Sequence, residues 1–150
     1  IEYNCRFGDP ETQVVLPLLE SDLLQIMTAC TEGTLAETEV QFSSGAAACV
    51  ILASGGYPVS YEKGKPISGL ENGQLPGEPD ITVYHSGTAL TEDGQLVTAG
   101  GRVLGVTATA PALPGALTKA YAAAEKIHFE KLHKRTDIGL RALKAIAEKG

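Results

Sequence analysis

Polar side chains at the start of the chain have types and spacings that suit metal binding. Glu2 and Asn4 belong to the alternating segment Ile-Glu-Tyr-Asn-Cys-Arg-Phe, so they share one face if this segment is a strand. Their Cα atoms would then lie roughly 6–7 Å apart. A carboxylate and an amide oxygen at that spacing can bind one hard cation such as Mg²⁺. The pattern indicates a metal site, although E-x-N also occurs by chance on strands that merely face solvent.

The charged residues that follow add candidate anion sites. Arg6 continues the same polar strand face, and a guanidinium can bind a carboxylate or a phosphate through two parallel hydrogen bonds. Gly8 permits a turn, and the next two residues are typical of a helix start, with Asp9 as the N-cap and Pro10 at the first helical position. The backbone N–H groups of such a helix start would form a second anion site.

Two glycine-containing segments further along the chain are also candidate binding sites. Gly100, Gly101 and Arg102 precede a predicted strand, where backbone N–H groups can turn toward a phosphate and the arginine can complete the pocket. The alternative is a tight turn with an exposed arginine. His85 and Thr88 can belong to a ligand site, or His85 can simply end a strand while Thr88 caps a turn.

Two other polar groups are interpreted as structural. The first surrounds a loop and comprises Tyr57, Tyr61 and Lys63. The second contains a predicted ion pair near the C-terminal helix and comprises Arg135, Asp137 and Arg141.

Composition excludes several classes of partner. The 150 residues are 43% hydrophobic and carry a net charge of −6, with no tryptophan and no basic stripe, so we expect no nucleic-acid partner. The longest apolar run, residues 46–53, is far shorter than the roughly 18 residues of a membrane span, so we expect no membrane partner. The three cysteines, Cys5, Cys30 and Cys49, have no C-x-x-C spacing and lie among apolar neighbours, so we predict buried, unreactive thiols. Free thiols favour a reducing compartment, and we expect the protein to be cytoplasmic.

The hydrophobic pattern of the first 35 residues predicts one strand and two helices. Residues 1–7 alternate as a half-buried strand, and a helix follows from Pro10 until Pro17 breaks or kinks it. Asp22 restarts a helix, and Gly33 ends it.

From about residue 45 the pattern changes to short strands separated by turns. The predicted strands are residues 47–53, 81–85, 95–98 and 102–108. Residues 92–94 form a hairpin turn, and the glycines and prolines of residues 61–79 prevent a long element there. Helical spacing follows over residues 113–127 and 140–146. Strands followed by helices predict an α+β fold, with an antiparallel sheet flanked by helices.

The opening segment also resembles a family motif. Residues 1–17 match [LIV]-E-[FY]-N-x-R-F-G-D-P-E-x-Q-V-x-L-P, which ends the ATP-grasp fold in glycinamide ribonucleotide synthetases. Five further motifs of this family follow in order. They are G-Y-P-x-x-Y-x-K-G-x-x-I-x-G at 56–69, H-[AS]-G-T-A at 85–89, G-G-R-V-L-x-V-T at 100–107, K-I-x-F at 126–129 and R-x-D-I-G-x-R-A at 135–142. The resemblance covers essentially the whole chain.

This resemblance implies a reaction and a metal. The family uses ATP to convert glycine to glycyl phosphate, which the amine of 5-phosphoribosylamine attacks to give glycinamide ribonucleotide, ADP and phosphate. By the same resemblance, Glu2 and Asn4 hold Mg²⁺ or Mn²⁺ on the nucleotide phosphates.

The resemblance also implies roles for the substrate-binding residues. Arg6 becomes a catalytic and substrate-binding candidate that holds a carboxylate or phosphate, and Asp9 a candidate for the glycine ammonium group. A pure helix cap is the alternative for Asp9. The further substrate-binding candidates are Thr88, Gly100, Gly101 and Arg102.

The resemblance predicts two domains. Residues 1–35 would be the end of an ATP-grasp domain, and residues 36–150 a C-terminal α+β domain. The chain contains neither G-x-x-x-x-G-K-[ST] nor G-x-G-x-x-G. We therefore expect the chain alone to be inactive and to need the N-terminal part of the same enzyme.

Two alternatives remain at this stage. Another ATP-grasp carboxylate–amine ligase or carboxylase would share the Glu-x-Asn pair, but we would not expect it to share R-F-G-D-P-E or G-G-R-V-L-x-V-T. A non-catalytic interaction domain is the second alternative.

Overall fold

The centre of the molecule is a four-stranded antiparallel sheet. The structure is a computed structural model that describes residues 6–148. The strand order is β2 (Ile81–His85), β5 (Arg102–Ala110), β1 (Ala46–Ser54) and β6 (Leu132–His133). β1 and β5 pair over almost their whole length, and their register shifts by one residue between Leu52 and Ala53. The mixed α/β architecture with an antiparallel sheet is therefore as predicted.

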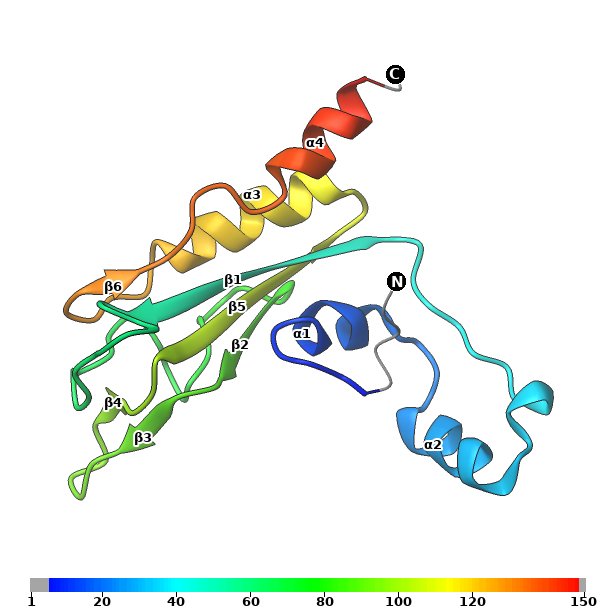
Figure 1. Cartoon of the computed structure of the whole chain (residues 1–150), viewed down its shortest axis with the longest axis horizontal. Helices are drawn as coiled ribbons and strands as arrows, with labels where there is room; N and C mark the ends of the chain where they lie inside the picture. Colours follow the sequence, from blue (N-terminus) through cyan, green and yellow to red (C-terminus); the bar gives the residue numbers. More distant parts are fainter. Residues whose placement is uncertain (1–5, 149–150) are drawn as a thin grey trace.

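One face of the sheet carries the hydrophobic core. The fully buried Val50 and Leu52 alternate along β1 and pair with Val106 and Leu104 of β5, so all four point to the same side. Helix α3 (Leu113–Ala124) packs there, and its buried face is mostly alanine, which lets helix and sheet approach closely. Figure 1 shows α3 lying along the sheet.

Helix α3 ends earlier than the hydrophobic pattern predicted. It stops at Ala124, whereas the predicted helix runs to residue 127. Ile127 nevertheless remains only 1% exposed, because the chain turns after the helix and returns its side chain to the core. The buried Ile127 therefore extended the helical pattern of apolar residues in the sequence beyond the end of the helix.

A two-stranded hairpin lies beside the main sheet. It consists of β3 (Thr88–Leu90) and β4 (Leu96–Thr98), with Leu90 opposite Leu96. The predicted turn is confirmed, since the backbone N–H of Gly94 donates to the carbonyl of Thr91. The three-residue strand β3 and the two-residue strand β6 were not predicted, because such short strands leave no alternating pattern.

Short helices precede and follow the sheet. They are α1 (Thr12–Val15), the 3₁₀ turn η1 (Leu16–Leu18), α2 (Leu23–Glu32), the 3₁₀ turn η2 (Leu35–Glu37) and α4 (Leu140–Ala147). Pro17 lies in η1, where the first helix ends, as predicted. Asp22 caps α2 by accepting from the N–H groups of Leu24 and Gln25, and Gly33 ends it with φ of 73°.

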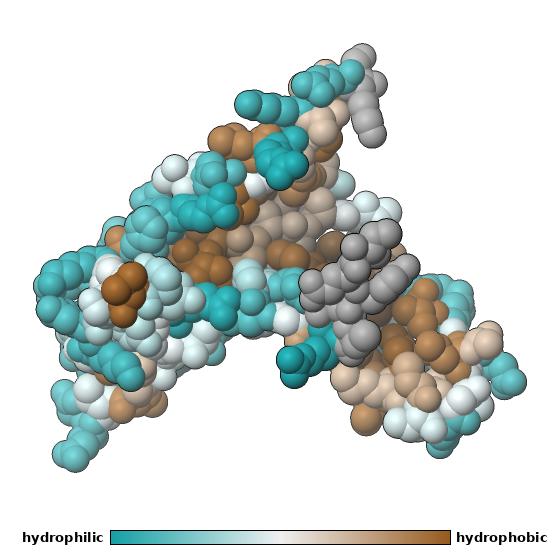
Figure 2. All heavy atoms as spheres, viewed as in Figure 1, coloured by the Kyte–Doolittle hydropathy of each residue, from teal (hydrophilic) through white to brown (hydrophobic). Residues whose placement is uncertain are grey.

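Helix α1 lies on the side of the sheet opposite α3 (Figure 1). The side chains that alternate with the core residues on β1, Cys49 and Ile51, point to that side. Helix α2 lies further from the sheet, and Figure 2 shows apolar side chains gathered over it. Within residues 6–148, no helix is long and apolar enough to span a membrane.

Candidate functional site

The structure brings two of the predicted binding residues together. Nη2 of Arg102, at the start of β5, lies 3.3 Å from Oδ2 of Asp9, and its Nη1 donates to the Asp9 backbone carbonyl at 2.9 Å. These residues are 93 positions apart in the sequence. Both side chains are partly exposed, so the pair is accessible to a ligand. It joins the opening motif to the sheet.

The turn that holds Asp9 differs from the predicted helix start. Helix α1 begins at Thr12, so Asp9 is not its N-cap and Pro10 is not its first residue. The backbone N–H of Gly8 donates to Oε1 of Glu11 at 3.1 Å, and both the N–H and the hydroxyl of Thr12 donate back to the Gly8 carbonyl. The turn is therefore stabilised by its own side chains.

The structure leaves fewer backbone donors for the predicted anion site at this helix start, which stays a prediction. Helix α1 has four residues, and the N–H groups of Val14 and Val15 donate to the Glu11 carbonyl. Backbone donors on which an anion site would depend are thus used within the turn.

Gln13 is a site residue that sequence reasoning missed. Its Nε2 donates to Oδ1 of Asp9 at 2.6 Å, so the Asp9 carboxylate lies between Gln13 and Arg102. Its Oε1 is buried and has no hydrogen-bond partner among the described residues. The i, i+4 spacing of Asp9 and Gln13 could have indicated this contact. Asp9 was instead predicted to be the N-cap of the helix, so its side chain was not considered as a partner for Gln13.

The glycine pair before β5 is required by packing. A Cβ on Gly101 would lie 2.1 Å from Cδ2 of Tyr57, and one on Gly100 would lie 3.0 Å from Cα of Gly87. Ser54 donates its N–H to the Gly101 carbonyl and its hydroxyl to the Gly100 carbonyl. These contacts fix the position of Arg102, while binding of phosphate by the N–H groups of this pair remains a prediction.

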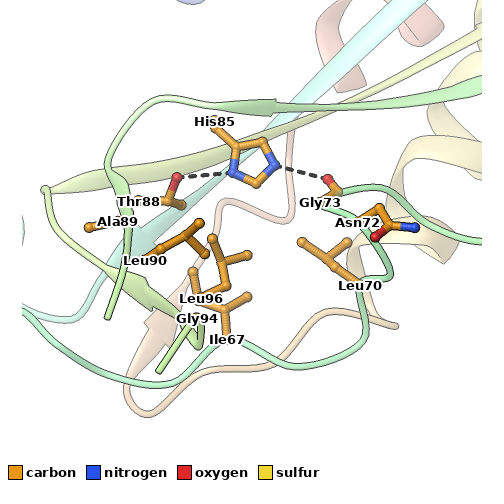
Figure 3. Close-up of a pocket in the computed structure, with 10 residues that line it drawn as sticks. All are labelled: Ile67, Leu70, Asn72, Gly73, His85, Thr88, Ala89, Leu90, Gly94 and Leu96. Atoms are coloured by element: carbon orange, nitrogen blue, oxygen red, sulfur yellow. Dashed lines mark hydrogen bonds between the residues drawn. The ribbon is translucent and has the colours of Figure 1, made fainter. Parts of the chain in front are cut away.

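His85 and Thr88 form a second polar cluster (Figure 3). Nδ1 of His85 lies 2.9 Å from Oγ1 of Thr88, and its Nε2 lies 2.9 Å from the carbonyl of Gly73. This cluster lines a cavity of about 780 Å³, into which the side chains of Leu90 and Leu96 also point. Thr88 is thus engaged by His85, and a role in substrate binding remains a prediction.

Two smaller cavities adjoin the opening motif. One of about 410 Å³ is lined by Asp9, Gln13, Tyr84 and His85, among others. The other, of about 340 Å³, is lined by apolar side chains and by four basic ones. We call it the basic cavity, and define it by Pro10, Tyr57, Arg102, His133, Lys134 and Arg135.

Ionisable groups beneath the motif are held neutral. Burial raises the pKa of the Cys49 thiol, and the nearby Asp9 carboxylate raises it further. Burial likewise raises the pKa of Tyr84. These shifts argue against a nucleophilic thiolate at Cys49. Cys30, by contrast, is exposed, because its side chain lies on the uncovered side of α2. The prediction of a buried thiol is therefore wrong for Cys30.

The predicted metal ligands lie outside the described residues. Glu2, Asn4 and Cys5 all precede residue 6, where the described part of the chain begins. Arg6 is exposed in a bend that leads to the Asp9 turn. Within residues 6–148, no group of three or more His, Cys, Asp or Glu side chains is arranged to hold a metal ion.

Comparison with known proteins decides the family. Residues 47–141 match the family described as phosphoribosylglycinamide synthetase, C domain. The chain belongs to this family. The match covers the main sheet, the hairpin and α3, and the resemblance noted in the sequence is confirmed.

Several members of this family are closely similar to the chain. Phosphoribosylamine–glycine ligase of Synechocystis sp. is 49% identical over 144 residues, which are 95% of this chain and 33% of that protein. The chloroplastic enzyme of Arabidopsis thaliana is 45% identical over 96% of this chain and 27% of its own length. The crystal structure of phosphoribosylamine–glycine ligase from Thermotoga maritima superimposes with a TM-score of 0.68 and 37% identity, covering 91% of this chain and 32% of that one. The chain thus spans about a third of these proteins.

Proposed function

We propose that this chain is the C-terminal part of a phosphoribosylamine–glycine ligase. The enzyme would join glycine to 5-phosphoribosylamine with ATP, giving glycinamide ribonucleotide, ADP and phosphate. The activity for which the similar proteins of Synechocystis sp. and Arabidopsis thaliana are named supports this proposal. The observation that carries the proposal in this chain is the Asp9–Arg102 pair, because it holds the opening motif against the family's C domain.

In this proposal the chain's own residues bind and orient the small substrates. Arg6 is exposed and can bind the carboxylate of glycine or an acyl phosphate. Asp9 can hold an ammonium group, since its carboxylate is fixed by Gln13 and Arg102 and is still partly exposed. Fixing both ends of glycine before reaction would orient its acyl carbon for attack by the amine of 5-phosphoribosylamine.

The metal site remains part of the proposal. The carboxylate of Glu2 and the amide of Asn4 are oxygen ligands of the kind that Mg²⁺ and Mn²⁺ accept. A bound ion would neutralise charge on the ATP phosphates during phosphoryl transfer. We also propose that residues 1–35 end an ATP-grasp domain, that residues 36–150 form the C-terminal domain, and that the enzyme works in the cytoplasm.

Exchanging Asp9 in the full-length enzyme tests this proposal. Asp9→Asn should lower glycine-dependent release of ADP at least tenfold, because the carboxylate that would hold the ammonium group is lost. Glu92→Gln, which removes an exposed carboxylate in the β3–β4 turn, is the matched control and should leave turnover unchanged. Wild-type activity in Asp9→Asn, or an enzyme without glycine-dependent turnover, would contradict the proposal.

The metal assignment has a separate test. Glu2→Ala should abolish turnover and weaken Mg²⁺-dependent ATP binding while leaving the circular dichroism spectrum unchanged. Full activity in this variant would remove Glu2 from the site.

A further inference from the structure

We propose that His85 and Thr88 are positioning residues for Arg102, and the consequence for activity rests on the proposed function. The two residues lie at the ends of the turn between β2 and β3, and their side chains are joined across it. Their hydrogen bond holds the turn, residues 86–87, against the glycine pair that precedes Arg102. They would thus act on the Asp9–Arg102 pair without contacting a substrate.

The ring of His85 uses both of its nitrogens within the protein (Figure 3). Its Nε2 lies 2.9 Å from the carbonyl of Gly73, which can only accept, so this nitrogen carries the proton. In the neutral ring Nδ1 is then the acceptor, and the hydroxyl of Thr88 donates to it across 2.9 Å. Neither nitrogen is left to bind a ligand, which favours a positioning role over a ligand role for His85.

The turn packs directly on the segment that carries Arg102. The N–H groups of Ser86 and Gly87 both donate to the carbonyl of Val103 at 3.0 Å. The N–H of Ala99 donates to the carbonyl of Gly87 at 2.7 Å. A Cβ on Gly87 would lie only 2.4 Å from the carbonyl oxygen of Arg102. Backbone therefore meets backbone with no side chain between them, so a shift of the turn is passed on to Arg102.

The glycine pair is held in a second way by the main sheet. Ser54, the last residue of β1, donates its hydroxyl to the carbonyl of Gly100 and its N–H to the carbonyl of Gly101. Ser54 is fixed by its strand, whereas the turn between β2 and β3 belongs to no strand. The side-chain bond that closes this turn is therefore the contact that a single substitution can release without disturbing a strand.

The position of Arg102 matters because its guanidinium fixes the carboxylate of Asp9. The two groups are 3.3 Å apart and partly exposed, so their ion pair adds little stability, and its main effect is to orient the carboxylate. In the proposed function this carboxylate holds an ammonium group. A displacement of about 1 Å in a substrate-positioning group can lower a rate by about a hundredfold.

Two substitutions of Thr88 in the full-length enzyme test the inference. Thr88→Val keeps the branched shape but loses the hydroxyl, and should lower kcat/KM for glycine-dependent ADP release by about tenfold. Thr88→Ser keeps the hydroxyl and should retain wild-type activity. Thr91→Val is the matched control, since it removes a hydroxyl that donates to Asp93 in the β3–β4 turn, and it should leave activity unchanged. Wild-type activity in Thr88→Val would overturn the inference, as would an equal loss in Thr91→Val.

His85→Phe is a second variant that tests the same bond from its other end. It keeps a ring beside the two cavities that His85 lines, but it removes both hydrogen bonds. It should lose at least as much activity as Thr88→Val. Wild-type activity in His85→Phe would show that the bond does not position Arg102.

Coupling with Arg102 separates positioning from direct substrate binding. In an Arg102→Gln background, Thr88→Val should cost little further activity, because the guanidinium that the bond positions is already gone. If Thr88 binds a substrate by itself, the two losses will multiply, and the inference is wrong.

Crystal structures of the full-length wild type and the Thr88→Val variant give a readout that does not depend on activity. The Asp9–Arg102 ion pair should be present in the wild type and broken in the variant. If it is broken in this way while glycine-dependent turnover is absent from the wild type, the proposed function is wrong and the positioning role stands. If the pair stays intact in Thr88→Val, the positioning role is wrong, and the proposed function keeps its own test in Asp9→Asn.

Discussion

Two regions of the molecule differ in what holds them together. Residues 46–148 contain a core of large side chains, with Val50, Leu52 and Leu104 completely buried. Among the described residues of the first region, 6–43, Ala29 is the only buried apolar side chain. Its other large apolar side chains are half-buried or exposed, and the exposed ones are Phe7, Val15, Leu24, Met27, Leu35, Val40 and Phe42.

The sheet region thus provides most of the hydrophobic core, whereas the first region provides the charged residues of the candidate site. The first region carries the charged motif, and the sheet region carries the core that fixes its counterpart, Arg102. Exposed apolar patches of this kind are typical of surfaces that pack against another part of a protein, as Figure 2 illustrates for α2. The predictions below test this division, in order of decreasing effect.

Truncating one leucine in each region should give very different losses of stability in the 150-residue chain. Leu104→Ala leaves a cavity in the packed core and should lower the free energy of unfolding by about 2–5 kcal/mol. Leu24→Ala removes a side chain that is 72% exposed, and should change it by less than about 0.5 kcal/mol. Urea denaturation followed by circular dichroism measures both. Similar losses in the two variants would show that the regions share one core.

Adding a methyl group at Gly101 should have the next largest effect. The new Cβ would lie 2.1 Å from the Tyr57 ring, so the ring must move. Gly101→Ala should lower stability by about 1–3 kcal/mol. Gly64→Ala is the control for adding a side chain to a glycine, because a Cβ there meets nothing within 4 Å, although its φ of 77° carries a strain of its own. Equal losses at the two positions would contradict a steric role for Gly101.

Removing the cap of α2 should have a smaller and local effect. Asp22→Ala loses the acceptor for two backbone N–H groups and should destabilise the helix by about 1 kcal/mol. Amide hydrogen exchange should accelerate in α2 and stay unchanged in β1 and β5, since the sheet is held by a separate core. Faster exchange throughout the sheet would contradict that independence.

Much of the sheet region could be predicted from the sequence. The strands β1, β2 and β5 are long runs rich in small or β-branched residues between turn signals, so their positions follow from local pattern. The register shift at Leu52/Ala53 left no local signal, although it sets the direction of Arg102.

The site was predicted less completely. Asp9 and Arg102 were identified from residue type and resemblance, but their contact depends on tertiary structure across 93 positions. The N-cap prediction for Asp9 failed because Gly8, Glu11 and Thr12 stabilise a different turn. The predicted ion pair of Arg135 and Asp137 is confirmed, but only the pairing of β6 with β1 reveals that this arginine faces the basic cavity.

A double-mutant cycle on Asp9 and Arg102 tests the central claim most directly. In the full-length enzyme, Asp9→Asn, Arg102→Gln and the double variant are compared by kcat/KM for glycine-dependent ADP release. Because the two side chains form one unit that joins the motif to the sheet, each single variant should lose activity. The double variant should lose little more than the worse single variant. Losses that multiply would show that the two residues act independently, and would contradict this account.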